Sequence, residues 1–381
     1  MPSPVLRNMP ESDVRQWIAD VISDREDGFF QASQFTDSRI LQVCVDEGVA
    51  SLFRYHLKQQ GKLDQLSEPL QQQLKTLDIQ NIASQLARQT ELAQLLRLFE
   101  KKSLKPLLLK GEALAQTLYP SAHLRTRCDT DLFFADKKTA EKAWKILEAQ
   151  RYQRIPTMEG RFSGFQFACT RQLPSGITME LDIHNRINNY QWFSQRLSYD
   201  ELIAESCLFA YPTPQRDHVN VAIVNPLYQL IHACVHRICN RVRQTENRLI
   251  WLYDIHLLYS NLTSGDRDKL VRVAHDKDLS GIILEGLNAS VATFATPVEK
   301  QLLDRLSGNS RNETASFNPH GRRIHFYLQD WFQNKGFCNK LRHLMEKLFP
   351  PASYVREKYQ VKNRYLLPWY YLKRILDVII R

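Results

Sequence analysis

The stretch that decides the fold is residues 107–134, LLLKGEALAQTLYPSAHLRTRCDTDLFF. Two short apolar runs, 107–109 and 132–134, enclose a Lys-Gly pair, a helical segment and the acidic pair Asp129 and Asp131. The first run belongs to the apolar segment 104–109 and the second to the segment 129–135, and both segments read as buried strands. Residues 112–118 between them read as a helix, which the Tyr-Pro-Ser tripeptide stops. We therefore predict a strand, a helix and a second strand, with two aspartates at the start of the second strand.

The segments that follow extend this pattern into a small sheet. Residues 137–150 have the composition of an amphipathic helix, and residues 162–170 and 177–183 read as two strands joined by the turn Leu-Pro-Ser-Gly at 173–176. Residues 11–100 and the chain from Leu197 onward read as helical. This predicts an α+β fold: a small mixed β-sheet core flanked by predominantly helical N- and C-terminal regions.

Four segments follow from these patterns. The predicted linker is the polar stretch 308–320, which is rich in turn residues. The segments are an N-terminal helical region (1–100), a core (101–195), a helical domain (196–307) and a basic, aromatic-rich helical segment (321–381).

Composition places the chain among ordinary globular proteins. The apolar fraction is 43% and the charged fraction 24%, and no long uncharged apolar run predicts a membrane-spanning helix. The N-terminus lacks the basic-then-apolar order of a signal peptide. Seven scattered cysteines, an odd number, indicate reduced thiols. We expect a cytoplasmic protein.

Most of the net charge of +10 lies at the C-terminal end. Residues 321–381 contain 13 Lys/Arg and 4 Asp/Glu, a balance of +9. Basic residues interleaved with aromatic ones can hold a nucleic acid or an anionic surface. The other interpretation is a basic, partly buried helical cap whose aromatic side chains belong to the core. The aromatic residues concerned are Trp331, Tyr354, Tyr359, Tyr365, Trp369, Tyr370 and Tyr371.

The acidic pair predicts a cation site. In a strand, residues i and i+2 point to the same side, so Asp129 and Asp131 place two carboxylates next to each other. Such like charges are costly unless a cation neutralises them or one carboxyl is protonated. Hard divalent cations prefer carboxylate oxygens together with phosphate and water. A metal site for phosphoryl or nucleotidyl transfer is one interpretation, and a solvated strand end is the other.

A third acid is available in the segment TMELDIHNRI. Its period-two alternation puts Glu180, Asp182 and His184 on one face and apolar residues on the other. If this strand lies beside the strand of Asp129 and Asp131, one of its acids completes a triad.

Residues that precede the acidic pair fit the phosphate end of such a site. A glycine after a strand lets the backbone approach a ligand, and a helix N-terminus favours an anion, so Lys110 and Gly111 are candidates. Arg125 and Arg127 can also face phosphates. A simple turn and surface arginines are the alternatives.

Two further clusters have structural interpretations. His232, Cys234, His236 and Cys239 suggest a zinc site, and on a helix His232 and His236 share a face, with Cys239 three residues further on. A fourth ligand on that face and a clean loop geometry are both missing, which favours packed helix residues. Arg248, Trp251 and Asp254 recur at helical spacing and predict an ion pair that joins helices, with a substrate contact as the alternative. Cys128 has no histidine beside it on the same element and is not a candidate nucleophile.

The sequence resembles a known family. LLLKGEAL, YPSAHLRTRCDTDLFF and ELDIHNRI, in this order, resemble the uncharacterised nucleotidyltransferase family of the DNA polymerase beta-type nucleotidyltransferase superfamily. LYQLIHACVHRI, RLIWLYDIHLL and LFPPASYVREKY are similar to its helical and closing segments, so that the resemblance runs from about residue 35 to the C-terminus.

The resemblance implies an enzyme that transfers a nucleoside monophosphate from an NTP to an acceptor hydroxyl with Mg²⁺ or Mn²⁺, releasing pyrophosphate. Asp129 and Asp131 match the paired metal-binding acids, and Asp182 matches the third acid, which helps to deprotonate the acceptor. Gly111 matches the phosphate-binding glycine. His236 recurs in the helical region and can line the acceptor site.

One departure from the family pattern bears on activity. Glu112 follows Gly111, where the superfamily usually has glycine or serine, although Lys110 can substitute as a phosphate contact. A nucleotide- or RNA-binding protein on the same fold, without catalysis, is therefore the alternative function. An enzyme acting on RNA ends through the basic C-terminal segment is a further variant. Small molecules, peptides, proteins and RNA all remain possible acceptors, and the sequence leaves the NTP and the oligomeric state open.

Overall fold

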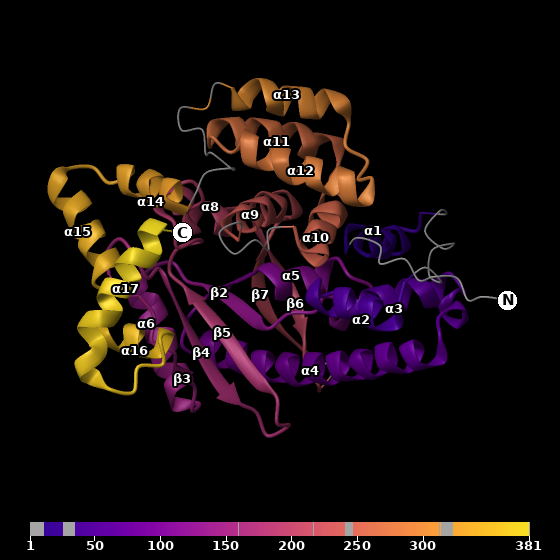
Figure 1. Ribbon diagram of the computed structural model, residues 1–381, viewed down its shortest axis with the longest axis horizontal. Helices are drawn as coiled ribbons and strands as arrows, with labels where there is room; N and C mark the ends of the chain where they lie inside the picture. Colours follow the sequence, from indigo (N-terminus) through magenta and orange to yellow (C-terminus); the bar gives the residue numbers. More distant parts are fainter. Residues whose placement is uncertain are drawn as a thin grey trace. The chain divides into compact units, whose positions relative to one another are not determined.

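The computed structural model describes residues 11–25, 35–158, 160–215, 217–240, 247–311, 313 and 323–380. The chain divides into two compact units, each built from three separate stretches. Figure 1 labels their helices and strands. The helical unit comprises Met1–Arg88, Lys110–Cys128 and Pro226–Thr314. The sheet unit comprises Gln89–Leu109, Asp129–Asn225 and Ala315–Arg381.

The helical unit contains only helices and loops among its described residues. The last of its three stretches, Pro226–Thr314, contains its most apolar helix, α10. This helix is buried on most sides because it packs against both α9 and α12. The helices are α1 (Glu11–Ile22), α2 (Asp37–Asp46), α3 (Ala50–Gln59), η2 (Leu63–Gln65), the first part of α4 (Glu68–Lys101), α5 (Lys110–Thr117), η3 (Ala122–Leu124), α9 (Pro226–Cys239), α10 (Leu249–Ser260), α11 (Ser264–Asp276), α12 (Ser280–Phe294) and α13 (Lys300–Ser310).

The sheet unit is built on a mixed sheet, which in the described part of the chain has seven strands in the order β3-β4-β5-β2-β1-β7-β6. The pairs β2–β5 and β1–β7 are parallel, and the other neighbours are antiparallel. The strand β2 is therefore the middle one. The strands are β1 (Leu107–Leu109), β2 (Asp129–Phe133), β3 (Gln153–Arg154), β4 (Gln166–Gln172), β5 (Thr178–His184), β6 (Ser206–Pro212) and β7 (His218–Val224).

Helices cover both faces of this sheet. The end of α4 packs on one face, where the rings of Phe99 and Phe134 are 5.7 Å apart in an edge-on arrangement. On the other face Phe133 meets Tyr199 with ring centroids 5.2 Å apart. Because side chains alternate along a strand, Asp131 lies on the same face as Phe133. The helices of this unit, besides the end of α4, are α6 (Lys137–Ala149), α7 (Gln191–Ser194), α8 (Tyr199–Ala204), α14 (Arg323–Phe332), α15 (Phe337–Leu348), α16 (Ala352–Lys358), η5 (Arg364–Leu366) and α17 (Leu367–Ile380).

The α+β class and the mixed sheet predicted from the sequence are confirmed. The turn before β5 is present, with Gly176 at a φ of 81° that favours glycine. The expectation of helix alone from Leu197 onward is wrong, because β6 and β7 extend the sheet beyond β1. The strand expected from residue 162 begins later, at Gln166.

The boundaries of the four predicted segments stay a prediction. Residues 314–320 of the predicted linker lie outside the described residues. Within the described ranges, no helix combines the length and the apolar character that crossing a bilayer requires.

Candidate metal centre

The two acidic segments lie side by side in the sheet. The strands β2 and β5 are parallel neighbours, and their register pairs Asp129 with Glu180 and Asp131 with Asp182. Registered residues of adjacent strands present their side chains on the same face. The predicted adjacency of the acidic pair and the third acid is therefore confirmed as a strand pairing.

Three of these side chains converge on one point. The ligand atoms of Asp131, Asp182 and His184 all lie within 4.8 Å of one another. The Nε2 atom of His184 donates a hydrogen bond to Oδ1 of Asp131 at 2.8 Å. Gln166, on β4, donates from Nε2 to Oδ2 of Asp182 at 3.1 Å. Both carboxylates are thus oriented by side chains from strands on the same side of β2.

Burying the charged and polar groups of this cluster costs free energy. Asp131 is 2% exposed and His184 1% exposed, and a buried carboxylate is stable only when it is paired or coordinates a metal. The Nδ1 atom of His184 is buried without a hydrogen-bond partner, which costs about 1–3 kcal/mol.

The donor set itself, two carboxylates and one imidazole, fits a divalent cation. Carboxylates suit Mg²⁺ and Mn²⁺, whereas imidazole is a better ligand for the first-row transition ions than for Mg²⁺. These residues therefore fit the metal that the resemblance implies, and the histidine favours Mn²⁺ over Mg²⁺ if it ligates directly.

Asp129 and Glu180 are not members of this group, although all the acids concerned lie in the described chain. Asp129 is half-buried at the start of β2, two residues before Asp131 on the same face, and Glu180 is its half-buried register partner. The structure thus brings together one member of the predicted acidic pair, the predicted third acid and the histidine that the sequence placed on the same face as that acid.

The residues predicted for phosphate binding belong to the helical unit. Lys110 has a φ of 49°, in the left-handed region that costs a non-glycine residue energy. Gly111 is buried, and a Cβ there would meet Cδ of Arg127 at 3.3 Å. The guanidinium of Arg127 in turn forms an ion pair with Glu112, and the two side chains are 4% and 1% exposed. In this structure Gly111 and Glu112 accommodate Arg127.

Arg125 is also held by an acid. Its Nε lies 2.9 and 3.0 Å from the two carboxylate oxygens of Asp254, and its Nη2 lies 2.7 Å from Oδ2. Tyr119 donates its hydroxyl to Oδ1 of the same carboxylate at 2.7 Å. Burial raises the pKa of Asp254 above its ordinary value, and the nearby Arg125 opposes that rise. The structural interpretation of Asp254, as one half of an ion pair that joins helical elements, fits this arrangement.

The histidines and cysteines of α9 do not form a metal group, as judged from the described chain, which includes all four of them. His236 packs edge-on against Trp251 with ring centroids 4.9 Å apart. The amide of Asn240 lies 3.1 Å from Nε2 of His236. Burial raises the pKa of the Cys234 thiol to about 12, so that this sulfur is a poor ligand at neutral pH. The zinc interpretation is therefore not supported.

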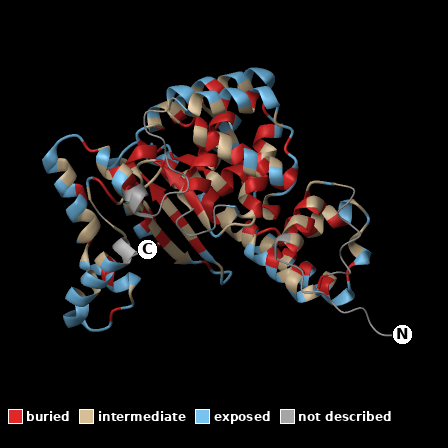
Figure 2. Ribbon diagram, turned by 45° about the horizontal axis from the view of Figure 1, so that its top comes forward, coloured by how far each residue is buried: buried red, intermediate tan, exposed pale blue. Residues whose placement is uncertain are grey.

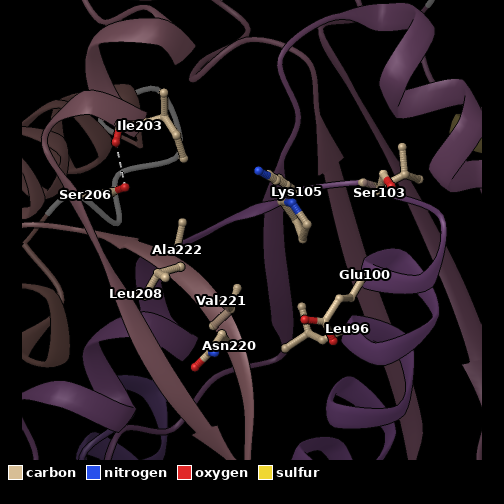
Figure 3. A pocket seen from close by; sticks show the side chains of 12 residues that line it. Leu96, Glu100, Ser103, Lys105, Ile203, Ser206, Leu208, Asn220, Val221 and Ala222 are labelled. Atoms are coloured by element: carbon tan, nitrogen blue, oxygen red, sulfur yellow. Dashed lines mark hydrogen bonds between the residues drawn. The ribbon is translucent and has the colours of Figure 1, made fainter.

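A separate pocket of about 510 Å³ opens in the sheet unit between the end of α4 and the strands β6 and β7 (Figure 3). Lys105 and Glu100 lie at this pocket, whose other walls are mostly apolar, among them Leu208, Val221 and Ala222. None of the residues predicted for the site lines it. The carboxylates and the pocket are distinct features of the sheet unit.

One residue of the cluster, Gln166, carried no signal in the sequence. Its position is defined by the antiparallel register of β4 and β5, which sets Gln166 opposite His184 and Ala168 opposite Asp182. A strand prediction that began at residue 162 contained this glutamine, but nothing in the sequence alone indicates which polar residue of β4 reaches the acids.

Comparison with known proteins identifies relatives of this chain. A family model described as an uncharacterised nucleotidyltransferase matches residues 33–295. Among solved structures, the chain is similar to an antigenic nucleotidyltransferase-like protein from Paracoccidioides brasiliensis. The identity is 16%, the TM-score is 0.34, and the similarity covers 55% of this chain and 97% of that one. No curated protein matches the sequence. The family match ends before residues 348–359, so the resemblance expected for that segment is not part of it.

Proposed function

The chain belongs to the family of uncharacterised nucleotidyltransferases, and from this premise we propose that it is a metal-dependent enzyme. It transfers a nucleoside monophosphate from an NTP to an acceptor hydroxyl. The observation that carries the proposal is the convergence of Asp131, Asp182 and His184 on adjacent parallel strands. A site of this composition is suited to hold a divalent cation beside a phosphate.

In the proposed reaction the acceptor oxygen forms a bond to the α-phosphorus, and the bond from that phosphorus to the bridging oxygen of pyrophosphate breaks. Pyrophosphate leaves with the electron pair, and the proton of the acceptor hydroxyl passes to a carboxylate, for which we propose Asp182. When bound, a divalent metal supplies Lewis-acid activation of the acceptor oxygen and neutralises charge on the leaving group.

The roles of the chain's own residues follow from their contacts. Asp131 and Asp182 are the proposed metal ligands, and Asp129, earlier on the same face, is the proposed additional ligand. His184 holds Asp131 through the hydrogen bond to Oδ1, and Gln166 holds Asp182. Fixed orientation matters because ligands held by a second layer of hydrogen bonds bind a metal more tightly.

The triphosphate contact is proposed for Lys110 and Gly111, on the basis of the family pattern. The ion pair of Arg127 with Glu112 engages the arginine that the sequence suggested as a further phosphate ligand.

The test is metal-dependent release of pyrophosphate from each of the four NTPs. We expect release with Mg²⁺ or Mn²⁺, and a loss of at least about a hundredfold in Asp131→Asn and in Asp182→Asn. Asp217→Asn is the matched control, because this exposed acid lies in the sheet unit outside the cluster. Unchanged release in both cluster variants would exclude the site.

A second function is favoured by the state of Glu112. The superfamily usually has a small residue at this position, whereas here a buried carboxylate is paired with Arg127. A protein that binds nucleotide without catalysis fits this departure. It would show an NTP-dependent rise in melting temperature, lost in Asp131→Asn, without any release of pyrophosphate.

We also propose a cytoplasmic location. None of the seven cysteines, each at a described position, forms a disulfide, which is the usual state of cysteine in reducing compartments.

A further inference from the structure

The C-terminal helices of the sheet unit carry many exposed residues (pale blue in Figure 2), and an unusual share of them is large and apolar. Of the 17 large hydrophobic residues that are exposed in the described chain, 12 lie between Leu328 and Leu376. The most exposed are Phe337 at 78%, Tyr365 at 76%, Phe332 at 62% and Trp369 at 61%. So many large exposed apolar side chains in one part of the chain are unusual, because large exposed apolar patches on globular proteins mark interaction surfaces.

Helix α15 shows that this exposure is organised. Phe337, Leu341, Leu344 and Met345 follow the i, i+4, i+7, i+8 spacing of one helical face, and each is at least 43% exposed. The opposite face carries His343, which is 2% exposed. Amphipathic helices of globular proteins turn their apolar face inward. Here the polar side is inside.

Polar contacts hold that face of α15 in place. The carboxylate of Glu346 accepts hydrogen bonds from the backbone amides of Arg161 and Phe162 at 3.0 and 2.9 Å. His343 Nδ1 lies 2.8 Å from the side-chain amide of Asn334. The orientation of α15 is therefore fixed by hydrogen bonds on its buried side, and the apolar stripe faces solvent as a consequence.

Helix α17 has the same inverted arrangement. Trp369, Leu372 and Leu376 share one face at i, i+3, i+7 and are 61%, 49% and 45% exposed. Arg374, only 7% exposed, points to the other side. Its Nε and Nη2 atoms donate to the carbonyl of Lys347 at 3.2 and 2.9 Å.

Helix α14 repeats the arrangement in its second half. Leu328 and Phe332 are one turn apart and are 44% and 62% exposed. Between them Asp330 is 1% exposed and accepts a hydrogen bond from the backbone amide of Trp192 at 3.2 Å. Three helices that contact one another thus all turn apolar side chains outward.

The exposed charges around these stripes are mostly positive. Between Leu328 and Leu376, a region that the structure describes throughout, Glu357 is the one exposed acid, since Asp330 and Glu346 point inward. The exposed basic residues of this region are Lys335, Arg342, Arg356, Lys358, Lys362, Arg364 and Lys373. The surface therefore combines apolar and aromatic side chains with an excess of positive charge.

We propose that α14, α15 and α17 form a docking surface for an anionic lipid bilayer, on which the protein binds without crossing the membrane. Exposed Leu and Phe stripes insert into the interface, Trp and Tyr suit the headgroup level, and lysines and arginines attract anionic headgroups. The basic charge is complementary to such lipids. It also opposes pairing with a second copy of the same surface, because like charges would face each other.

RNA is the other anionic partner that basic and aromatic residues can bind, but the exposed side chains fit it less well. RNA binding relies on aromatic stacking platforms and cations. Here seven of the 12 exposed large side chains are Leu or Met, which offer neither: Leu328, Leu341, Leu344, Met345, Leu366, Leu372 and Leu376.

The experiment is co-sedimentation of the full chain with vesicles of phosphatidylcholine and phosphatidylserine, compared with phosphatidylcholine alone. We expect binding to the mixed vesicles only, weakened by salt. The double variants Phe337→Gln/Leu341→Gln and Trp369→Gln/Leu372→Gln should each lose binding at least tenfold. Because these side chains are exposed, we expect both variants to fold, which circular dichroism checks.

Two further variants sharpen the test. Lys362→Gln and Lys373→Gln should each weaken binding about fivefold, the fold-change expected from removing one cation near an anionic surface. Ile79→Gln/Leu86→Gln is the matched control, because these residues of α4 are 56% and 58% exposed and lie outside the C-terminal helices. It should bind vesicles as the wild type does.

Three outcomes would overturn the proposal. The first is no preference for anionic vesicles. The second is that the protein does not bind vesicles but binds single-stranded RNA in a salt-sensitive way, and that the two apolar-to-Gln double variants bind this RNA as well as the wild type does. The third is concentration-dependent self-association that the same variants abolish, again without vesicle binding, which would assign the stripes to a second copy of the chain.

Discussion

The ion pair of Arg125 and Asp254 offers the sharpest test of how the helical unit is held together. Three N–O distances of 2.7 to 3.0 Å join the two groups, and their side chains are only 7% and 4% exposed. Removing one partner of such a pair leaves a buried charge without compensation, which costs about 3–5 kcal/mol. We expect the loss of unfolding free energy in Asp254→Leu to lie at the upper end of this range, because the Tyr119 hydroxyl also loses its hydrogen-bond acceptor.

Replacing both partners should cost much less than the sum of the single changes. In Arg125→Met/Asp254→Leu no charge is left uncompensated, and apolar replacements of buried pairs are often neutral or stabilising. We expect the double variant to lose no more than about 2 kcal/mol, so that the double-mutant cycle gives a coupling energy of several kcal/mol. Urea unfolding, followed by circular dichroism, measures all four corners of the cycle.

An exposed pair provides the control, and additivity would refute the reasoning. Arg305 and Asp268 are joined at 2.6 Å, but their side chains are 44% and 59% exposed. Asp268→Asn should therefore cost less than about 1 kcal/mol. If the single changes at Arg125 and Asp254 simply add in the double variant, the pair is not coupled.

The folded double variant should also keep any metal-dependent NTP binding. Loss of that binding would indicate that Arg125 contacts the phosphates of the nucleotide.

Two further predictions concern a titrating group and a tight packing position. Burial raises the pKa of Asp330 from 3.8 to about 6, so its contribution to stability is full below pH 4 and is lost as the pH rises through 6. Two pKa units are worth about 3 kcal/mol at most, and unfolding titrations should show Asp330→Asn gaining on the wild type by up to that amount between pH 4 and 7. A parallel pH dependence of the two proteins would contradict this origin. Gly286→Ala should destabilise the protein by about 1–3 kcal/mol, because its Cβ would lie 2.6 Å from Sγ of Cys234. Gly308→Ala, in a helix with nothing within 4 Å, should instead be neutral or stabilising, and equal melting temperatures for the two variants would show that the contact relaxes freely.

The core of the sheet was predictable because its strands carry local signals. The apolar run at residues 107–109, the acidic strand and the alternating segment from Thr178 to His184 each have the length and period of a strand. The strands β6 and β7 were missed, although His218–Val224 also alternates, with Val219 and Val221 buried and Asn220 exposed between them. The helical composition on both sides of this hairpin outweighed a short signal. Their place beside β1 comes from tertiary pairing.

The same limit applied to the C-terminal segment. The sequence showed basic and aromatic residues together and left open a partly buried helical cap with core aromatic residues. Tyr365 and Trp369 are exposed and the other five aromatic residues are half-buried, so none of the seven is fully buried. Helical periodicity gives two faces of α15 and α17 but not which of them is buried. That choice depends on Glu346 and Arg374, which find backbone partners far away in the sequence.

The position of Asp131 explains why the site was only partly predictable. Sequence spacing places Asp131 on one face with Asp129, and Asp182 with His184, but the parallel register of β2 and β5 decides which of them meet. That register offsets His184 by two residues from the partner of Asp131 and so brings its imidazole to the carboxylate. Because β2 is the middle strand, this carboxylate is shielded from water on both sides, and its charge must be met by protein or metal. His184 therefore acts through Asp131: His184→Gln, which keeps a donor, should retain metal affinity better than His184→Leu, which removes it. Equal affinities would mean that the imidazole does not orient the acid.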